Sequence, residues 1–320
     1  MRARVLLTNP IHPTYQAELA KHVDVVLASD PSAQSIAREI MDCDAMIVRA
    51  HLPQDIFDHA PRMKYVVRHG VGLDLIPMQQ ATERGIIVAN MPGGNTVAVT
   101  EYALAAIFHI RRGLSLIDTT LRDQGWNAAK PMSNHCIELA GSTCGVIGVG
   151  SIGTRLATAL DALGVKVLGL TRRPQTLPAF VNAVDKKTLL EQSDIIVLAC
   201  PHNEQTHHLI NAAAIAQMKR GAAIVNVARG PVIDTAALVP ALHSGQVGAA
   251  VLDVHEPAVL SGDEPIFGCP NTLLTPHIAG LTATSLENLS RGSVETVLAL
   301  LEGRRPDNVV NPEVFDKSRG

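Results

Sequence analysis

The sequence predicts an α/β protein of two domains, each built on a doubly wound parallel sheet. Short runs rich in β-branched and apolar residues alternate with helix-like stretches along most of the chain, which is typical of parallel sheets covered by helices. The alternation stops once, after the glycine-rich segment 90–95, where a long helical pattern intervenes, and then restarts. With 320 residues, the chain is also long enough for two domains of ordinary size.

The first third of the chain contains alternating strand and helix patterns. Strands are expected at 3–8, 23–28, 45–49, 65–68 and 86–89. Helices are expected between them, at 13–22, 31–41, 53–59 and 75–84. The first three helical segments begin with Pro13, Pro31 and Pro53, and a missing N–H is tolerated in the first turn of a helix.

The rest of the chain begins with two helical patterns, at 97–112 and 114–124, followed by a loop that contains Trp126 and Pro131. A second series of strands is then expected at 143–148, 166–171, 195–199, 223–227, 248–252 and 272–274. An amphipathic helix at 284–302 closes the series, and we expect it to return to the first domain.

Composition excludes several classes of function. The 27 basic and 30 acidic residues give a net charge of −3, and aromatic residues are few (Phe 5, Tyr 3, Trp 1), so a nucleic-acid-binding surface is not expected. No apolar run approaches the roughly 18 residues that a membrane helix needs, and no signal peptide is recognisable. The five cysteines form no C-x-x-C pair, which predicts reduced thiols in a cytoplasmic protein and no metal site.

A glycine-rich motif follows the strand expected at 143–148. Gly148, Gly150 and Gly153 form a G-x-G-x-x-G pattern that opens an apolar-periodic helix. Such glycines permit a tight turn, a close approach of a pyrophosphate and close packing of helix on strand. We therefore predict a Rossmann dinucleotide-binding domain at 98–285, inserted into a flavodoxin-like substrate domain formed by 1–97 and 286–320.

The end of the next strand indicates which dinucleotide is bound. NAD-binding sites usually have an acidic residue there that binds the ribose 2′-hydroxyl. This chain has Thr171, followed by Arg172 and Arg173. Because a hydroxyl and two guanidinium groups can bind a 2′-phosphate, the sequence favours NADP(H) over NAD(H).

Three chemically competent residues follow consecutive strands of the second series. Arg229, Glu256 and His277 each lie shortly after a predicted strand, and ligands of open α/β sheets bind at the carboxyl ends of the strands. An arginine can bind a substrate carboxylate and polarise a ketone. A histidine can donate the proton, and a carboxylate beside it favours the charged imidazole. Together they suit hydride reduction of a 2-keto acid, in which a nicotinamide supplies the hydride.

The ordered motifs resemble the D-isomer-specific 2-hydroxyacid dehydrogenases, a family that includes D-3-phosphoglycerate dehydrogenase and the glyoxylate/hydroxypyruvate reductases. The resemblance covers nearly the whole chain. Its motifs are Val48-Arg49, Arg68-His-Gly-Val-Gly72-Leu-Asp74, Asn95-Thr-Val-Ala-Val-Thr-Glu101, the glycine loop, Cys200-Pro-His-Asn-Glu-Gln-Thr206, Asn226-Val-Ala-Arg229-Gly-Pro-Val-Ile-Asp234, Leu252-Asp253-Val and Thr275-Pro-His277-Ile.

The resemblance implies roles for individual residues. Arg229 would bind and polarise the substrate, and His277 would be the general acid/base. The backbone of Val71 and Gly72 would cradle the substrate carboxylate, with Arg49 and Arg68 near a further anionic group. The cofactor contacts implied are pyrophosphate contacts from Ser151 and Ile152, a nicotinamide contact from Asp253, and a cleft lining of Cys200, Pro201, Thr206, Val227 and Gly280.

One motif departs from the family pattern. The family places a Glu-Pro pair five residues after the aspartate, where this chain has Ala258, whereas Glu256 follows Asp253 by three residues. We expect Glu256 to be the partner of His277, with Glu264 as the alternative.

The favoured function is that of a stand-alone reductase of glyoxylate or hydroxypyruvate. The resemblance further implies a homodimer with the apolar face of 97–124 as its interface, and plain core packing is the alternative explanation of that face. An NAD-dependent enzyme similar to D-3-phosphoglycerate dehydrogenase is the main alternative. A formate or phosphite dehydrogenase and a dinucleotide-sensing binding protein or corepressor are further alternatives.

Overall fold

The computed structural model describes residues 2–317, and it divides the chain into two compact units. The first unit contains the residues up to Asn95 and those from Leu281 onward, and the second contains Thr96–Gly280. Residues 1 and 318–320, which the sequence assigns to the substrate domain, lie outside the described residues. Each unit is described below by itself.

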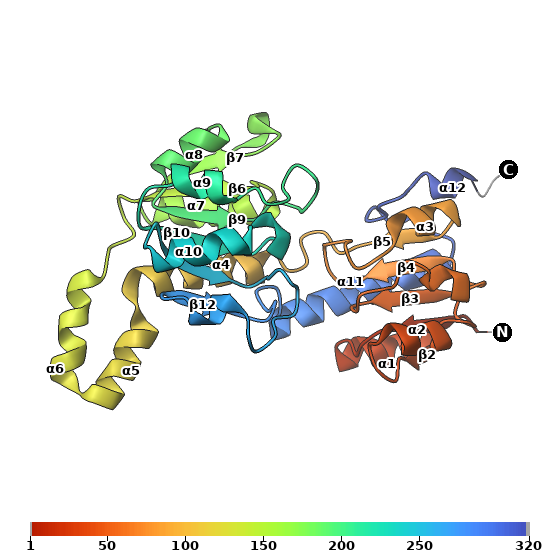
Figure 1. The fold of residues 1–320 in the computed structure, drawn as a ribbon. Helices are drawn as coiled ribbons and strands as arrows, with labels where there is room; N and C mark the ends of the chain where they lie inside the picture. The colour runs from red at the N-terminus through yellow and green to blue at the C-terminus, as the bar shows by residue number, and fades with distance from the viewer. Residues whose placement is uncertain (1, 318–320) are drawn as a thin grey trace. The chain divides into compact units, whose positions relative to one another are not determined.

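The first unit is a parallel five-stranded sheet in the order β2-β1-β3-β4-β5 (Figure 1). The strands and the helical segments between them are β1 (Arg4–Leu7), α1 (Pro13–His22), β2 (Asp24–Leu27), α2 (Ala33–Glu39), β3 (Ala45–Val48), a 3₁₀ helix (Ile56–His59), β4 (Tyr65–Arg68), α3 (Met78–Glu83) and β5 (Ile87–Ala89). This is a doubly wound order whose direction reverses between β1 and β3, as the sequence predicts.

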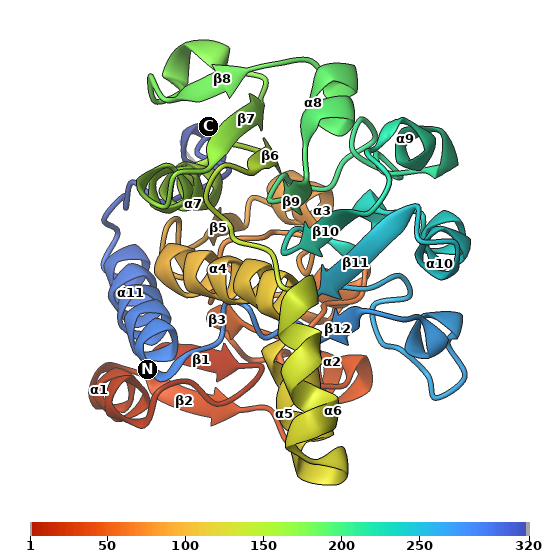
Figure 2. The ribbon, with the colours of Figure 1, turned by 90° about the vertical axis from the view of Figure 1, so that its left-hand side faces the viewer.

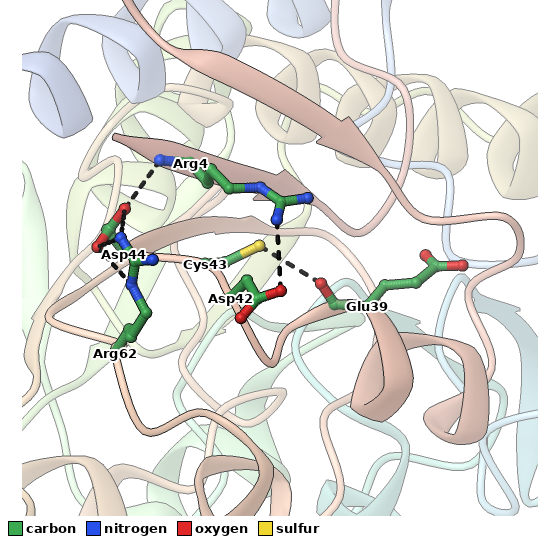
Figure 3. Close-up of polar contacts among 6 residues, drawn as sticks. All are labelled: Arg4, Glu39, Asp42, Cys43, Asp44 and Arg62. Carbon is green, nitrogen blue, oxygen red and sulfur yellow. Dashed lines mark hydrogen bonds and ion pairs between the residues drawn. The ribbon is translucent and has the colours of Figure 1, made fainter. Parts of the chain in front are cut away.

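The amino-terminal edge of this sheet is held by a polar cluster (Figure 3). The Asp44 carboxylate accepts a hydrogen bond from the backbone N–H of Arg4 at 2.9 Å and pairs with the Arg62 guanidinium at 2.8 Å. The Cys43 thiol donates to the backbone carbonyl of Glu39 at 3.4 Å, and burial raises the pKa of Cys43 to about 11. This thiol therefore stays protonated, and the cluster ties the starts of the strands together.

The closing helix α11 (Ala283–Leu301) belongs to the first unit. It starts with a capping box, in which Thr282 and Ser285 each bond the other's backbone N–H. Its apolar face, with Leu289 and Val297, packs in the cluster that also contains residues of β1, β3 and α1. After the helix, the chain makes an antiparallel bridge between Val309 and Ala89, and the last described element is α12 (Val314–Lys317).

The second unit is a parallel seven-stranded sheet in the order β12-β11-β10-β9-β6-β7-β8 (Figure 2). The strands are β6 (Thr143–Ile147), β7 (Lys166–Leu170), β8 (Val181–Ala183), β9 (Ile195–Leu198), β10 (Ala222–Asn226), β11 (Val247–Leu252) and β12 (Thr272–Leu274).

Helices cover both faces of this sheet. One face packs against α4 (Thr96–Arg112) and α7 (Ser151–Ala162) through residues such as Ile107 and Leu156. The other face packs against α8 (Lys186–Gln192), α9 (Ala212–Gln217) and α10 (Thr235–His243) through Leu189, Ile215 and Leu238. The two-domain doubly wound fold class is therefore confirmed.

The structure corrects several local expectations. The loop expected around Trp126 and Pro131 is instead a short helix α6 (Trp126–Ala129) followed by a 3₁₀ helix (Lys130–His135). The helix expected at 53–59 is only the 3₁₀ helix named above, because so short a segment gains too few bonds to propagate an α-helix. Strand β8 and helix α12 were not expected. The expected boundary at 97/98 falls inside α4, which begins at Thr96.

Within residues 2–317, no helix combines the length and the apolar character needed to span a membrane.

Candidate active site

The glycine-rich loop between β6 and α7 has the shape of a phosphate cradle. Gly148 has a φ of +96°, and a Cβ there would lie 2.5 Å from the backbone nitrogen of Cys200. A Cβ at Gly153 would lie 2.3 Å from the carbonyl oxygen of Gly148, so the helix start presses on the turn. A Cβ at Gly150 would meet nothing within 4 Å, which leaves open space in front of the first amides of α7. The loop fits a dinucleotide pyrophosphate at a helix N-terminus.

The carboxyl end of β7 lies beside this loop. The Gly148 N–H donates to the carbonyl of Leu170, the last residue of β7, at 2.9 Å. Thr171 follows directly, and its hydroxyl oxygen accepts a hydrogen bond from the backbone N–H of Arg173 at 3.2 Å. Arg172 and Arg173 are exposed. This strand end therefore presents a hydroxyl and two guanidinium groups where NAD sites have a carboxylate.

The loop after β9 forms the opposite wall of the glycine turn. The backbone of Cys200 lies against Gly148, while its side chain is buried, the residue being 8% exposed, and burial raises the pKa of the thiol. Thr206 donates to the carbonyl of Pro201 at 2.7 Å and accepts from the N–H of Asn203 at 2.8 Å. These bonds fold the predicted cleft residues of this loop into one compact turn.

Three neighbouring strands end at the same level of the sheet. Asn226 of β10 pairs with Leu252 of β11, and Leu252 pairs with Leu274 of β12. The ladder continues one residue further, because Asp253 N–H donates to the Asn226 carbonyl at 3.1 Å and Thr275 N–H donates to the Leu252 carbonyl at 3.0 Å. The loops that carry Arg229, Glu256 and His277 therefore leave the sheet side by side.

The loop that carries Arg229 is closed by Asn226. The Asn226 amide donates to the Arg229 carbonyl at 3.0 Å and accepts from the Ala228 N–H at 3.0 Å. Gly230 presses on the next loop, since a Cβ there would lie 1.8 Å from the carbonyl oxygen of His255. Only glycine fits this close approach. The half-buried Arg229 is thus held on a rigid turn against the loop of Glu256.

His277 lies on a loop organised by Asp253. Its backbone N–H donates to the Asp253 carbonyl at 2.8 Å, and its φ is +57°, a left-handed conformation that is uncommon for residues other than glycine. Asp253 is 1% exposed, and its carboxylate accepts hydrogen bonds from Thr275 Oγ1 at 2.6 Å, Ile278 N–H at 2.7 Å and Ala279 N–H at 2.8 Å. The aspartate therefore holds the histidine loop, and its contact with a nicotinamide stays a prediction.

Glu256 has a partner that the sequence did not indicate. Its carboxylate lies 2.8 Å from His208 Nε2, and the two side chains are 36% and 37% exposed. The backbone N–H of His208 also donates to the carbonyl of Pro231 at 2.7 Å. The alternative residue, Glu264, accepts a hydrogen bond from Ser261 at 3.1 Å. The choice between Glu256 and Glu264 as partner of His277 stays a prediction.

The histidines near Glu256 interact with one another. His202 Nε2 lies 3.2 Å from His207 Nδ1, and the rings of His207 and His208 stack with centroids 4.0 Å apart. Among the described residues, no group of three or more His, Cys, Asp and Glu side chains could hold a metal ion.

In the first unit, the predicted substrate residues lie at the carboxyl ends of β3 and β4. Arg68 donates to the carbonyls of Val48 at 2.9 Å, His69 at 2.9 Å and Gly72 at 3.1 Å, so its guanidinium shapes the loop that contains Val71 and Gly72. Arg49 is half-buried and donates to the Pro10 carbonyl, and burial lowers the pKa of Arg49. Both arginines are therefore integrated into the loops rather than lying on an open surface.

The buried histidine of the same loop cannot serve as an acid. His69 is 5% exposed, its Nε2 lies 2.9 Å from Ser290 Oγ, and its pKa falls to about 3 because of burial and the nearby charge of Arg49. It is neutral at physiological pH and belongs to the framework of the loop.

Comparison with known proteins decides the family. The model of the D-isomer specific 2-hydroxyacid dehydrogenase NAD-binding domain matches residues 104–279. The chain belongs to this family. It is an oxidoreductase, an NAD(P)-dependent D-2-hydroxyacid dehydrogenase.

Individual relatives agree with the family model. The dehydrogenase is 34% identical over 327 residues to a glyoxylate reductase of Thermofilum pendens, with 98% of this chain and 96% of the relative covered. It is 34% identical over 314 residues to a D-3-phosphoglycerate dehydrogenase of Archaeoglobus fulgidus, with 96% of this chain but 59% of the relative covered. An NADPH-dependent glyoxylate/hydroxypyruvate reductase of Sinorhizobium meliloti, solved with NADP and malonate, has a TM-score of 0.85 and 27% identity, with 97% of each chain covered.

Two contacts of the dehydrogenase's site were missed at the level of sequence. Thr275 belongs to the motif Thr275-Pro-His277-Ile, yet only the fold shows that its hydroxyl donates to the Asp253 carboxylate. The contact of His208 with Glu256 joins residues 48 positions apart in the chain, and no spacing rule would have paired them.

Proposed function

We propose that this dehydrogenase reduces a small 2-keto acid, glyoxylate or hydroxypyruvate, to the corresponding 2-hydroxy acid with NADPH. The observation that carries the proposal is the alignment of the ends of β10, β11 and β12, which puts the loops of Arg229, Glu256 and His277 next to one another. The proposal is supported by the glyoxylate reductase of Thermofilum pendens, which aligns over nearly its whole length.

The roles of the side chains follow from their chemistry. The Arg229 guanidinium binds the substrate carboxylate through two hydrogen bonds and polarises the keto oxygen. His277 donates a proton to that oxygen during reduction and takes one from the hydroxyl in the reverse direction. Glu256 favours the charged state of the imidazole. The nicotinamide, when bound, supplies the hydride.

The remaining residues bind and orient. The backbone N–H groups of Val71 and Gly72 receive the substrate carboxylate. Arg49 and Arg68 lie near a further polar or anionic group of the substrate. The cofactor residues proposed are the glycine loop (Gly148, Gly150, Ser151, Ile152, Gly153), the end of β7 (Thr171, Arg172, Arg173) and the cleft residues Cys200, Pro201, Thr206, Val227, Asp253 and Gly280.

NADP(H) is the preferred cofactor in this proposal. The support is the end of β7, where Thr171, Arg172 and Arg173 replace the carboxylate of NAD sites and the two guanidinium groups are exposed. The similar reductase of Sinorhizobium meliloti is NADPH-dependent. A charge-assisted hydrogen bond contributes about 1.5–3 kcal/mol, which corresponds to a factor of about ten to a hundred in affinity.

The function is tested by following NADPH or NADH oxidation with glyoxylate, hydroxypyruvate, pyruvate, phenylpyruvate, 2-ketoglutarate and 3-phosphohydroxypyruvate. We expect the highest kcat/KM with glyoxylate or hydroxypyruvate, and at least about tenfold higher kcat/KM with NADPH than with NADH. Replacing Arg172 and Arg173 with alanine should remove most of the NADPH preference and leave kcat/KM with NADH within about threefold, because only NADPH carries the 2′-phosphate.

Arg220→Ala is a matched control for this experiment. Arg220 is an exposed arginine of the same unit that donates to the Ser244 carbonyl at 2.7 Å. Arg220→Ala should leave the ratio of kcat/KM with NADPH to kcat/KM with NADH unchanged. A tenfold preference of the unaltered enzyme for NADH would refute the cofactor proposal, and turnover of none of the keto acids would refute the function.

A second candidate is an NAD-dependent enzyme similar to D-3-phosphoglycerate dehydrogenase. It is favoured by Arg49 and Arg68, two cations at adjacent strand ends that suit a substrate with a second anionic group. The D-3-phosphoglycerate dehydrogenase of Archaeoglobus fulgidus is as similar in sequence as the glyoxylate reductase, although this chain covers only 59% of it. A preference for 3-phosphohydroxypyruvate and NADH in the same assay would select this candidate.

The carboxylate partner of His277 is tested with Glu256→Gln and Glu264→Gln. We expect the Glu256 variant to lower kcat about tenfold and to shift the pH profile of kcat to lower pH, since a neutral amide no longer favours the charged imidazole. If the Glu264 variant shifts the profile and the Glu256 variant does not, the role passes to Glu264.

We further propose a homodimer formed through α5 (Leu114–Gln124) and its neighbours. No residue of α5 is buried, and its Leu114 and Leu116 are both 59% exposed. Trp126, the first residue of α6, is 68% exposed. Figures 1 and 2 show α5 and α6 extending away from the sheet of their own unit. Such an apolar face suits an interface between copies of the chain. Sedimentation equilibrium distinguishes the dimer from a monomer.

The five free cysteines also favour a reducing compartment, the cytoplasm.

A further inference from the structure

The hydrogen bonds around Asp253 extend to a tyrosine on α4. Thr275 Oγ1 donates its proton to Asp253 Oδ1 at 2.6 Å, so only its oxygen lone pairs remain available. The hydroxyl of Tyr102 is within hydrogen-bond distance of Thr275 Oγ1. Because the Thr275 proton is already used, Tyr102 must be the donor in this bond. The order Tyr102 to Thr275 to Asp253 is set by the number of protons that each group carries.

The environment of this chain of bonds is buried and charged. Asp253 is 1% exposed, and Tyr102 and Thr275 are both partly buried. The pKa of Tyr102 is raised, mainly by burial and also by the negative charge of Asp253, although its bond with Thr275 acts in the opposite direction. The phenol therefore remains a proton donor, and a carboxylate in this setting depends strongly on each donor that it has.

The far end of the chain is the loop of the proposed acid. Asp253 uses its two carboxylate oxygens to bind the N–H groups of Ile278 and Ala279, and its backbone carbonyl binds the N–H of His277. His277 has a left-handed φ of +57°, a conformation that costs free energy for any residue other than glycine and persists where the surroundings hold it. The bonds to Asp253 provide that constraint on both sides of the residue.

We propose that Tyr102 and Thr275 are positioning residues of the dehydrogenase, which hold the Asp253 carboxylate in the orientation that places the His277 imidazole for proton transfer. The inference rests on the proposed role of His277 as general acid. Neither residue touches the substrate in this proposal, and both act through the loop. Small displacements of a catalytic group lower the rate strongly, whereas binding of the cofactor by the glycine loop is not affected.

The test uses variants that remove one hydroxyl at a time. Thr275→Val should lower kcat about tenfold to a hundredfold, and Tyr102→Phe about threefold to tenfold. The KM for NADPH should change less than kcat does, because Asp253 is only one of the proposed cofactor contacts and the glycine loop is left as it is. Thr275→Ser keeps the hydroxyl and should restore kcat to within about twofold of the unaltered enzyme. The double variant Tyr102→Phe, Thr275→Val should be no slower than Thr275→Val, because Tyr102 acts through Thr275.

Hydrogen exchange of the backbone amides at 278 and 279 provides a readout that does not need activity. Both amides should exchange faster in Thr275→Val and in Tyr102→Phe, since their acceptor is less constrained. Tyr65→Phe is the matched control, because Tyr65 is a partly buried tyrosine of the other unit whose pKa burial also raises. It should change neither kcat nor this exchange.

The outcomes separate this inference from the proposed function. Faster exchange together with lower kcat and rescue by serine supports the inference. Unchanged kcat in both single variants overturns it, whether or not exchange changes, and so does lower kcat without faster exchange. If Thr275→Val does not fold, Tyr102→Phe and Thr275→Ser still decide. If the unaltered enzyme reduces none of the keto acids, the proposed function fails and this inference fails with it.

Discussion

Replacing His277 with asparagine is expected to lower kcat for keto-acid reduction by about 10² to 10⁴ while leaving the Kd for NADPH within about threefold. An amide cannot donate the proton that the keto oxygen needs, and general acid catalysis contributes a factor of this size. Asparagine is the suitable replacement because His277 has a φ of +57°, and asparagine adopts left-handed backbone conformations more readily than most residues. Steady-state kinetics and the fluorescence of bound NADPH measure the two quantities.

The control for this variant is His22→Asn. His22 lies on the surface of the other unit, where its ring is 3.4 Å from Glu18. That change should leave kcat and the Kd for NADPH as they are in the unaltered enzyme. A His277→Asn enzyme that keeps more than a tenth of the original kcat, with the same thermal midpoint of unfolding, would show that another group supplies the proton.

Replacing Arg229 should have the second-largest effect. We expect Arg229→Gln to lower kcat/KM for the keto acid by about 10² to 10³, because it removes both the charge and the paired donors that bind the carboxylate. Arg229→Lys keeps the charge but loses the planar guanidinium, and we expect it to lower kcat/KM for the keto acid by about 10- to 100-fold. The Arg229 guanidinium also donates to the Ala228 carbonyl at 2.7 Å, so the thermal midpoint of unfolding is measured for both variants beside kcat/KM. Both variants keep the bond by which the Asn226 side chain closes the loop on the Arg229 backbone carbonyl.

Arg220→Gln serves as the comparison for Arg229→Gln. Arg220 precedes the same strand, β10, and also donates to a backbone carbonyl, but it lies at the amino end of that strand. It should leave kcat/KM unchanged. Equal losses in the two variants would mean that Arg229 stabilises the unit rather than binding the substrate.

The strands and most helices could be predicted because their causes are local. The helix at Pro13–His22, the strand at Tyr65–Arg68 and the helix at Leu114–Gln124 agree with the expected ranges. Each of the two helices has a proline or glycine at an end, and the strand is a short run rich in β-branched and aromatic residues. The 3₁₀ helix at Lys130–His135 and strand β8 were missed because short elements have too few residues to show a period.

The sequence predicted which loops carry the site residues, but not which of their side chains contact one another. The glycine loop is recognisable because Gly148 and Gly153 are required by close approaches within one strand–turn–helix unit. The partner of the Glu256 carboxylate was not recognisable, since His208 comes from the loop after a different strand. Likewise, Tyr102 belongs to an apolar-periodic helix in which nothing marks its hydroxyl as a donor to Thr275.

Local pattern was thus sufficient to establish a doubly wound two-domain protein, the glycine cradle and the three loops that carry Arg229, Glu256 and His277. Hydrophobic period, turn chemistry and glycine spacing act within a few neighbouring residues, so they can be recognised in the linear chain. The folded molecule alone decided which side chains meet, because sheet order and register bring together residues as far apart as Tyr102 and Thr275, 173 positions from each other. Contacts of this kind depend on how strands pair, and no short segment contains that information.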